Sequence, residues 1–591
     1  MRYCASPYRY VRRKTRPVII GDPENGGVVV GGGAPVIQQS MLTSNTLDTQ
    51  ACVEEAMALM DAGCRIIRIT TPTKKHAANL ENISAGIRAR GSNAPLVADV
   101  HFKPDAAMEA VKWCEMVRIN PGNYADSKKF AVREYTDEQY SAELERIEEQ
   151  FAPLVEECKL RARALRIGVN HGSLSDRIMN RFGDTPLGMV ESALEFARIA
   201  RKLDFHNFKF SMKSSNPKVM IKCYRLLAAR LAQLGSDWNY SLHLGVTEAG
   251  EGEDGRIKSA IGIGSLLCDG LGDTIRVSLT EDSPKEIAVC DGLIAQIGML
   301  TDPEVNLPNV DLAYDPSEYQ LRNTPEIELI DGVKCGGEQT IRVVVTQEVW
   351  NRTMPHMKST DDVKPEAIYE KLNVVEVDPR EEYILNCDTQ LITVKDGVGL
   401  PVITAFRLLA HRLKTAGASN PILLKDCLDI DEISEQPKIT LLRTSVVLGA
   451  LLCDGIGEAI LVRGENDARQ SLRLAYNVLQ AAGCRSFKAD YVACPSCGRT
   501  LFDLQEITAR IKARTKHLKG VRIAIMGCIV NGPGEMADAD FGYVGGAPNK
   551  INLYVGKKPV QYNIPENEAV ESLVDLIKEH DKWVEPQSVA V

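Results

Sequence analysis

The clearest chemical pattern in the sequence is a group of cysteines near its carboxyl end. Cys494 and Cys497 form a Cys-x2-Cys pair, Cys528 follows after thirty intervening residues, and Glu535 stands seven residues beyond Cys528. The surrounding Gly and Pro residues let backbone N–H groups approach sulfide. Three thiolates without a clear fourth cysteine favour an iron–sulfur cluster with one distinctive iron over a closed zinc site, which normally has four nitrogen or sulfur ligands.

Two other chemistries remain open from these residues alone. A zinc ion could take His517 or Cys484 as its fourth ligand, and a Cys-x2-Cys pair can be a redox dithiol, although no thioredoxin-like pattern surrounds this one. Glu535 is open in the same way. Most glutamates lie at the surface or cap a helix, but its place beyond a tight turn also allows an oxygen to ligate the fourth iron.

A second group of candidates consists of cations at the ends of β-rich runs. Arg68, Arg118, Arg166, Lys213 and Arg276 stand on five different runs. One such cation is more often a structural ion pair than a ligand group. In a parallel barrel, however, the carboxyl ends of all strands share the active-site face, so the five would converge on one mouth. Guanidinium and ammonium groups there suit a phosphate or diphosphate.

The elements that would carry these cations are eight short β-rich runs that alternate with helical patterns. The runs cover residues 36–41, 65–70, 95–102, 116–120, 165–170, 208–213, 240–247 and 274–279. Alternating strands and helices predict a parallel sheet, and eight units over about 270 residues fit a (β/α)8 TIM barrel. An open doubly wound sheet is the alternative, but no Gly-rich dinucleotide loop follows the first run.

An internal repeat lies beyond the barrel region. Residues 261–277 align with residues 446–462 at an offset of 185, and nine of the 17 positions are identical, including a shared Leu-Leu-Cys-Asp-Gly. Such self-similarity at a long offset indicates a duplicated module rather than a solenoid. The second copy has Leu461 where the first has Arg276, which points to a structural role for that copy.

We therefore predict an α/β protein of three domains. They are a TIM-barrel substrate-binding domain at 1–300, an inserted barrel-like structural domain at 301–485, and an α+β iron–sulfur domain at 486–591.

Composition limits the remaining classes. The 591 residues are 44% hydrophobic and 25% charged, which excludes a disordered chain. A net charge of −9 argues against nucleic-acid binding, and the absence of a run of about 18 apolar residues argues against a membrane span. Sixteen cysteines are far too few for a disulfide scaffold, so we expect a reducing cytoplasm. The basic stretch 2–16 is interpreted as a solvated arm.

Taken together, the motifs resemble the 4-hydroxy-3-methylbut-2-enyl diphosphate synthase family of the methylerythritol phosphate route to isoprenoids. Besides the cysteine motifs, the resemblance rests on Ala98-Asp-Val-His-Phe102, Arg118-Ile-Asn-Pro-Gly-Asn123, Arg166-Ile-Gly-Val-Asn170, His243-Leu-Gly-Val-Thr-Glu-Ala-Gly250 and Gly272-Asp-Thr-Ile-Arg-Val-Ser278. The segment at about 300–485 is absent from compact bacterial members and resembles the insert of the long form found in plants and some bacteria.

The resemblance implies an oxidoreductase. Its reaction is the reductive ring opening and dehydration of 2-C-methyl-D-erythritol 2,4-cyclodiphosphate to (E)-4-hydroxy-3-methylbut-2-enyl diphosphate with two electrons. It implies a 4Fe-4S cluster on Cys494, Cys497 and Cys528, with Glu535 as an exchangeable ligand of the fourth iron. Glu248 would be a proton donor or an electrostatic partner. The implied substrate-binding residues are Arg68, Arg118, Arg166, Asn170, Lys213 and Arg276.

The resemblance also implies a partner protein. Flavodoxin or ferredoxin would supply the electrons, since the sequence shows no flavin or nicotinamide motif. The chain could act as a monomer or a homodimer, because in compact relatives the barrel of one subunit meets the cluster domain of the other. Two other function classes stay open: a non-redox barrel enzyme with a structural zinc domain, and a non-catalytic iron–sulfur sensor.

Overall fold

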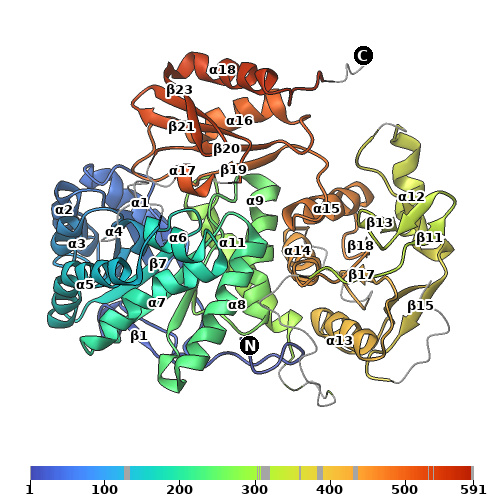
Figure 1. Ribbon diagram of the computed structural model, residues 1–591, viewed down its shortest axis with the longest axis horizontal. Helices are drawn as coiled ribbons and strands as arrows, with labels where there is room; N and C mark the ends of the chain where they lie inside the picture. The colour runs from blue at the N-terminus through green and yellow to red at the C-terminus, as the bar shows by residue number, and fades with distance from the viewer. Residues whose placement is uncertain are drawn as a thin grey trace.

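The fold consists of a barrel, a second parallel sheet beside it and a separate sheet above it (Figure 1). The computed structural model describes residues 2–124, 134–302, 304, 307, 320–358, 361–381, 390–429, 437–529, 532–536 and 538–586. No helix in these ranges is long and apolar enough to cross a membrane. None of the described cysteines forms a disulfide.

Eight parallel strands close into the predicted barrel in the order β10-β3-β4-β5-β6-β7-β8-β9. Each one falls on a predicted run. The strands are β3 (Ile37–Met41), β4 (Ile66–Thr70), β5 (Leu96–Asp99), β6 (Met116–Ile119), β7 (Ala164–Asn170), β8 (Phe208–Lys213), β9 (Ser241–Leu244) and β10 (Thr274–Ile275). They are buried along their whole length from β4 to β10, as expected for strands that are covered on both faces.

Helices surround the barrel, and short polar side chains set where they begin. They include α1 (Thr49–Asp61), α2 (Lys74–Ala89), α3 (Pro104–Ala110), α5 (Asp137–Leu160), α7 (Pro186–Lys202), α8 (Pro217–Leu234), α9 (Gly252–Ser259) and α11 (Pro284–Leu300). Asp48 accepts a hydrogen bond from the Ala51 amide at the start of α1, and Thr136 forms a capping box with Gln139 at the start of α5. Such caps fix the length of the loops that leave the barrel mouth.

The opposite end of the barrel is closed by a hairpin. Strands β1 (Val18–Ile20) and β2 (Val28–Val30) pair antiparallel. Their valines and isoleucine pack with Ile66, Val97 and Met116 at the beginnings of the barrel strands. This end is therefore an apolar plug, which leaves the other end as the polar mouth.

The middle region repeats this plan incompletely. Its parallel strands are β13 (Arg342–Val345), β14 (Ala367–Ile368), β15 (Val374–Val377), β16 (Leu391–Val394), β17 (Leu423–Lys425) and β18 (Ala459–Leu461). They run β14-β13-β18-β17, with the β15–β16 pair joined by an Ile392–Ile422 bridge. Because β18 is the repeat counterpart of β10, this order matches β4-β3-β10-β9 followed by β8 and β7. Counterparts of β5 and β6 do not occur in the described residues, so the region is barrel-like but open.

The two repeat copies pack against each other symmetrically. The first copy includes the π-helical turn Ala260–Gly264, and the second lies in α14 (Pro437–Cys453). A Cβ on Gly264 would clash with Val446, and a Cβ on Gly449 would clash with Ile261. At the offset of 185, Gly264 corresponds to Gly449 and Ile261 to Val446. Each copy thus presents the same patch to the other, as in an isologous dimer interface.

Four buried charges reinforce this pseudo-symmetric contact. Arg225 Nε donates to Asp269 at 2.9 Å, and its Nη1 donates to Asp454 at 2.6 Å. Arg407 on α13 (Val402–Thr415) makes the mirrored pair: its Nε donates to Asp454 and its Nη1 to Asp269, both at 2.8 Å. Asp269 and Asp454 are repeat counterparts, and each arginine begins an Arg-Leu-Leu-Ala segment.

The amino-terminal arm packs on this charge network, so the prediction of a solvated arm was wrong. Tyr3 and Tyr8 are buried. The Tyr3 ring lies under the Arg225 guanidinium, and the carbonyl of Pro7 accepts a hydrogen bond from Arg407. The basic composition of the arm predicted exposure, although two of its tyrosines belong to the core.

The C-terminal region has a core of its own. Its five strands run in sequence order: β19 (Asp490–Ala493), β20 (Arg522–Met526), β21 (Phe541–Ala547), β22 (Lys550–Val555) and β23 (Lys558–Pro565). Helices α16 (Leu504–Thr515) and α18 (Glu566–Glu579) contact each other, and their buried side chains share one apolar cluster with the sheet. The barrel and the middle region, by contrast, share one continuous apolar core.

Candidate active site

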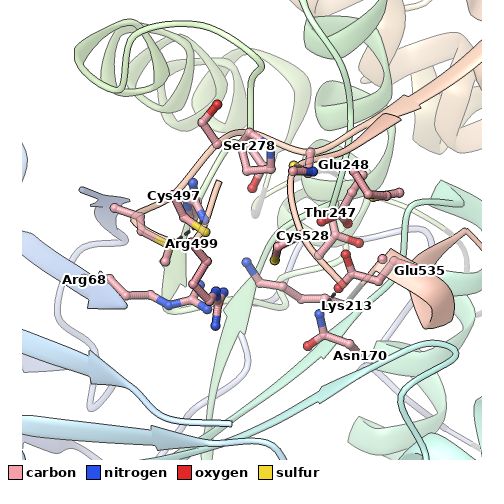
Figure 2. A pocket seen from close by; sticks show the side chains of 18 of the residues that line it. Arg68, Asn170, Lys213, Thr247, Glu248, Ser278, Cys497, Arg499, Cys528 and Glu535 are labelled. Carbon is pink, nitrogen blue, oxygen red and sulfur yellow. Dashed lines mark hydrogen bonds between the residues drawn. The ribbon is translucent and has the colours of Figure 1, made fainter. Parts of the chain in front are cut away.

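One cavity of about 70 Å³ lies between the barrel mouth and the loops of the C-terminal sheet (Figure 2). Every predicted site residue lines it: Arg68, Arg118, Arg166, Asn170, Lys213, Glu248, Arg276, Cys494, Cys497, Cys528 and Glu535. These side chains come from two regions that are about 200 residues or more apart in the sequence. The structure therefore brings the cationic group and the cysteine group into a single site.

The cations reach the cavity from neighbouring strands. Arg68 lies on β4, Arg118 on β6, Arg166 on β7 and Lys213 on β8, and Arg276 directly follows β10. Parallel pairing sets Arg118 opposite Arg166, which keeps the two guanidinium groups at the same level of the barrel. The barrel register, rather than any loop, positions this group.

Arg166 and Lys213 are buried without a counter-charge among the described residues. No acidic side chain lies within ion-pair distance of either, and Nε and Nη1 of Arg166 have no hydrogen-bond partner. Burial lowers the pKa of both groups well below the usual range, and neighbouring cations lower it further. An unpaired buried charge destabilises the folded protein, so this pair strongly favours the binding of an anion.

Asp99 is a buried carboxylate within the cationic group. It contacts Arg68 at 2.8 Å, Arg118 at 2.9 Å and His101 at 3.2 Å. Burial opposes its ionisation, but Arg68, then His101 and Arg118, hold the pKa of Asp99 well below its usual range. Burial lowers the pKa of His101 to about 3. Sequence analysis named Asp99 and His101 only as part of the Ala98–Phe102 motif, whereas the structure shows that Asp99 contacts two of the predicted substrate-binding arginines.

A carboxyl pair bridges the two regions. Glu248 follows β9 with a φ of 49°, a left-handed conformation that is uncommon for a residue other than glycine. Glu535 ends the short α17 (Gly532–Glu535), and Asn170 of the barrel donates a hydrogen bond to its Oε1. Burial, and then the charge of Glu248, raise the pKa of Glu535 well above its usual range. Oε2 of Glu535 has no hydrogen-bond partner in the described part of the chain.

The cysteines sit on two loops that leave neighbouring parallel strands. Cys494 follows β19 and Cys528 lies beyond the end of β20, so both loops emerge from the same edge of the sheet. Cys494 Sγ accepts a hydrogen bond from the Gly527 amide at 3.2 Å, and Ser496 between the two nearby cysteines has a φ of 62°. Burial, and then the Cys497 thiol, raise the pKa of Cys494 well above its usual range.

The donor set around the cavity fits an iron–sulfur cluster better than a closed zinc site. It consists of three thiols and a Glu535 oxygen that has no hydrogen-bond partner in the described residues. Neither candidate for a fourth zinc ligand lines the cavity: His517 bonds to the Val584 carbonyl, and Cys484 contacts the Ala482 carbonyl.

Arg499 is the main site residue that sequence reasoning left without a role. It lines the cavity beside the cysteines and contacts Asp99. The available signal was its position, two residues after Cys497 in a loop that was already predicted to hold a cluster. Thr247, Ser278 and Met41 line the cavity as well, but no spacing or charge pattern marked them.

Fold and site together define a (β/α)8-barrel enzyme whose cationic mouth is covered by a cysteine-bearing sheet domain. Two family models match the chain. The GcpE TIM-barrel domain covers residues 16–291, and the GcpE protein C-terminal domain covers residues 490–579.

Relatives that align along nearly the whole chain narrow the class of enzyme further. A 4-hydroxy-3-methylbut-2-en-1-yl diphosphate synthase (flavodoxin) of Akkermansia muciniphila is 56% identical, with 99% of each chain covered. A flavodoxin-type synthase of Protochlamydia amoebophila is 43% identical over 100% of this chain and 99% of its own. A chloroplastic ferredoxin-type synthase of Arabidopsis thaliana is 41% identical over 99% of this chain and 90% of its own. The chain belongs to the 4-hydroxy-3-methylbut-2-en-1-yl diphosphate synthase family.

Proposed function

We propose that the chain converts 2-C-methyl-D-erythritol 2,4-cyclodiphosphate to (E)-4-hydroxy-3-methylbut-2-enyl diphosphate in isoprenoid precursor synthesis. The reaction consumes two electrons and two protons and releases one water as the ring opens. Family membership supports this activity. The observation that carries it is the meeting of buried, uncompensated cations with three thiols and a carboxyl around one cavity.

The barrel residues bind the diphosphate. Arg166 and Lys213 supply the charge that lacks a partner in the free protein, and Arg68, Arg118 and Arg276 complete the cationic wall. Arg68 and Arg118 are held in place by Asp99, so little side-chain entropy remains to be lost on binding. Asn170, which Arg118 contacts at 2.7 Å, orients its amide between the cations and Glu535.

The C-terminal residues hold a 4Fe-4S cluster. Cys494, Cys497 and Cys528 would be its thiolate ligands, and Glu535 would offer an exchangeable oxygen ligand to the fourth iron. When bound, the cluster supplies electrons one at a time. Glu248 faces the same cavity and holds a proton or a negative charge against the substrate. Burial of the cations, Glu248 and Glu535 limits the access of bulk water to reduced intermediates.

One chain supplies both halves of this site, which supports activity as a monomer. Lys258 of the barrel contacts Asp490 at 2.8 Å, and Thr280 donates to the Cys494 carbonyl at 3.0 Å.

The proposed domains at 1–300, 301–485 and 486–591 are supported by how the apolar cores are shared. The C-terminal sheet has its own core and can open as a body, whereas the barrel and insert share theirs and stay together. Such an opening would admit the cyclic diphosphate to the cavity between the two regions.

The electron donor is a small one-electron carrier protein. The relatives are described as flavodoxin- or ferredoxin-dependent, and this sequence carries no flavin or nicotinamide motif of its own. Flavodoxin or ferredoxin is therefore the donor class to test first.

The decisive experiment combines metal analysis with turnover. The anaerobically purified chain should contain about four irons and four sulfides, as a 4Fe-4S cluster requires, and should convert the cyclic diphosphate with a low-potential reductant. Cys528→Ser should lose iron and activity together, whereas the matched variant Cys484→Ser should keep both. A protein with one tightly bound zinc and no iron would overturn the proposal.

A further inference from the structure

Arg499 connects the cysteine loops to the barrel. In Figure 2 its side chain lies near those of Cys497 and Arg68. Its Nη2 lies 3.5 Å from Asp99 Oδ2, and the Cys497 thiol is close enough to influence its charge. The side chain is about nine-tenths buried. Burial alone would lower its pKa, but the thiols of Cys497 and Cys528 together with Asp99 raise it.

The loop that carries Arg499 is pressed against the barrel. A Cβ on the preceding Gly498 would lie 2.6 Å from the Ser44 carbonyl oxygen and 2.8 Å from Thr70 Oγ1. Only glycine allows this approach without displacing the barrel backbone. The position of Arg499 is thus fixed by two independent features, the Gly498 contact and the Asp99 ion pair.

The one negative charge of Asp99 does not balance the positive charges of the arginines around it. One carboxylate serves Arg68, Arg118 and Arg499, so the sum of these four groups is positive on the side that faces the thiols. Hydrogen bonds and positive charge at the sulfur ligands stabilise the more negative, reduced state of an iron–sulfur centre. In a buried site this effect is only weakly screened.

We propose that Arg499 is a positioning residue that is anchored by Asp99, hydrogen-bonds the Cys497 thiolate and raises the reduction potential of the iron–sulfur centre when the C-terminal domain is seated on the barrel. The inference rests on the proposed function, because it requires the cluster. Arginine suits the task better than lysine, since its planar fork can bond a carboxylate and a thiolate at once. The Arg499–Asp99 ion pair also connects the reduction potential of the cluster to the carboxylate that contacts two substrate-binding arginines.

The test is a reduction potential, measured on the full chain without substrate. Arg499→Gln should keep its iron and shift the one-electron reduction equilibrium at least tenfold toward the oxidised state, about 59 mV in an EPR-monitored titration. Arg499→Lys should shift it less. Because Asp99→Asn also removes a negative charge, the informative comparison is the double variant: Arg499→Gln should shift the potential less in the Asp99→Asn background than in the wild type.

A matched control is Arg510→Gln on α16 of the same domain, whose side chain is 43% exposed and pairs with Glu506. It should leave the potential unchanged. An iron-loaded Arg499→Gln protein with the wild-type potential would overturn the inference. If that variant does not load iron, an unchanged potential in Arg499→Lys would overturn it. A wild-type chain without iron would instead refute the proposed function.

Discussion

The barrel and its incomplete repeat both carry buried cations on their parallel strands, but only those of the insert are paired with carboxylates in the examples that follow. In the barrel, Arg166 and Lys213 are buried without a carboxylate among the described residues. In the insert, Lys425 ends β17 and is just as buried, but it contacts Asp396 at 3.0 Å and Glu376 at 3.2 Å. Arg463, beyond β18, also pairs with Asp396.

The difference shows that burial and fold do not make a binding site by themselves. Both regions have parallel strands, a repeat helix and a hairpin packed on the strands, which in the insert is formed by β11 (Ile327–Ile330) and β12 (Val333–Cys335). In the described residues, however, Arg166 and Lys213 of the barrel have no carboxylate partner. The insert uses its charges as structural ion pairs, and its counterpart of Arg276 is Leu461. A binding site is therefore marked by the missing counter-charge, which costs stability in the free protein.

The largest effect on stability should come from the symmetric charge network between the two regions. Arg225→Met leaves Asp269 and Asp454 short of a cation in a fully buried setting. We expect the free energy of unfolding to fall by about 3–5 kcal/mol in urea denaturation. Arg407→Met should cost the same to within about 1 kcal/mol, because the two arginines make mirrored contacts. A cost confined to one of the two arginines would break the pseudo-symmetry argument.

Lys213→Met should separate function from stability. Loss of one charged hydrogen-bond donor, worth about 1.5–3 kcal/mol, should lower kcat/KM for the cyclic diphosphate by about 10- to 150-fold. Removing an uncompensated buried cation should at the same time raise the free energy of unfolding, by ~1–3 kcal/mol. Steady-state kinetics and urea denaturation of the same preparation test both signs. A variant that is less stable than the wild type would show that Lys213 has a structural partner.

Lys425→Met is the matched variant in the insert, and the sign of the stability change should reverse. Removal of the cation leaves Asp396 with Arg463 as its remaining cation and Glu376 with none. Because the two carboxylate side chains are 38% and 39% exposed, water limits the cost. We expect a loss of about 1–2 kcal/mol in the free energy of unfolding. Turnover of the folded enzyme should not change. A tenfold fall in kcat/KM would place the insert in the catalytic machinery.

Much of this contrast could be predicted from the sequence, because strand periodicity and motif spacing are local signals. All eight barrel strands and all eleven predicted site residues lay in such patterns. The counter-charges could not be predicted. Asp99 and Arg499 are 400 residues apart, and nothing near Lys213 or Lys425 in the sequence says which of them has a carboxylate partner.

The amino-terminal arm and the internal repeat also have features that could not be predicted from the sequence. Tyr3 and Tyr8 sit in a basic stretch whose composition predicts exposure, and only the tertiary contact with Arg225 and the insert explains their burial. The repeat alignment predicted duplication, but the mirrored packing of Gly264 and Gly449 depends on how the two copies meet in space.

The smallest expected effect concerns protons, and it follows from the missing counter-charge. Burial, and then the charge of Arg166, lower the pKa of Lys213 in the free protein, with Arg276, Arg68 and Arg118 adding to the effect. A bound diphosphate reverses this and raises the pKa, so above the pKa of the free protein substrate binding should take up protons, at most one from this group. Affinity should accordingly fall as pH rises through that range.

Titration calorimetry in buffers of different ionisation enthalpy measures the proton uptake. Lys213→Met should abolish it and Lys425→Met should preserve it, since the insert lysine already has its carboxylates. Equal uptake in the wild type and Lys213→Met would mean that another group neutralises the diphosphate, and that an unpaired cation is not what distinguishes the two regions.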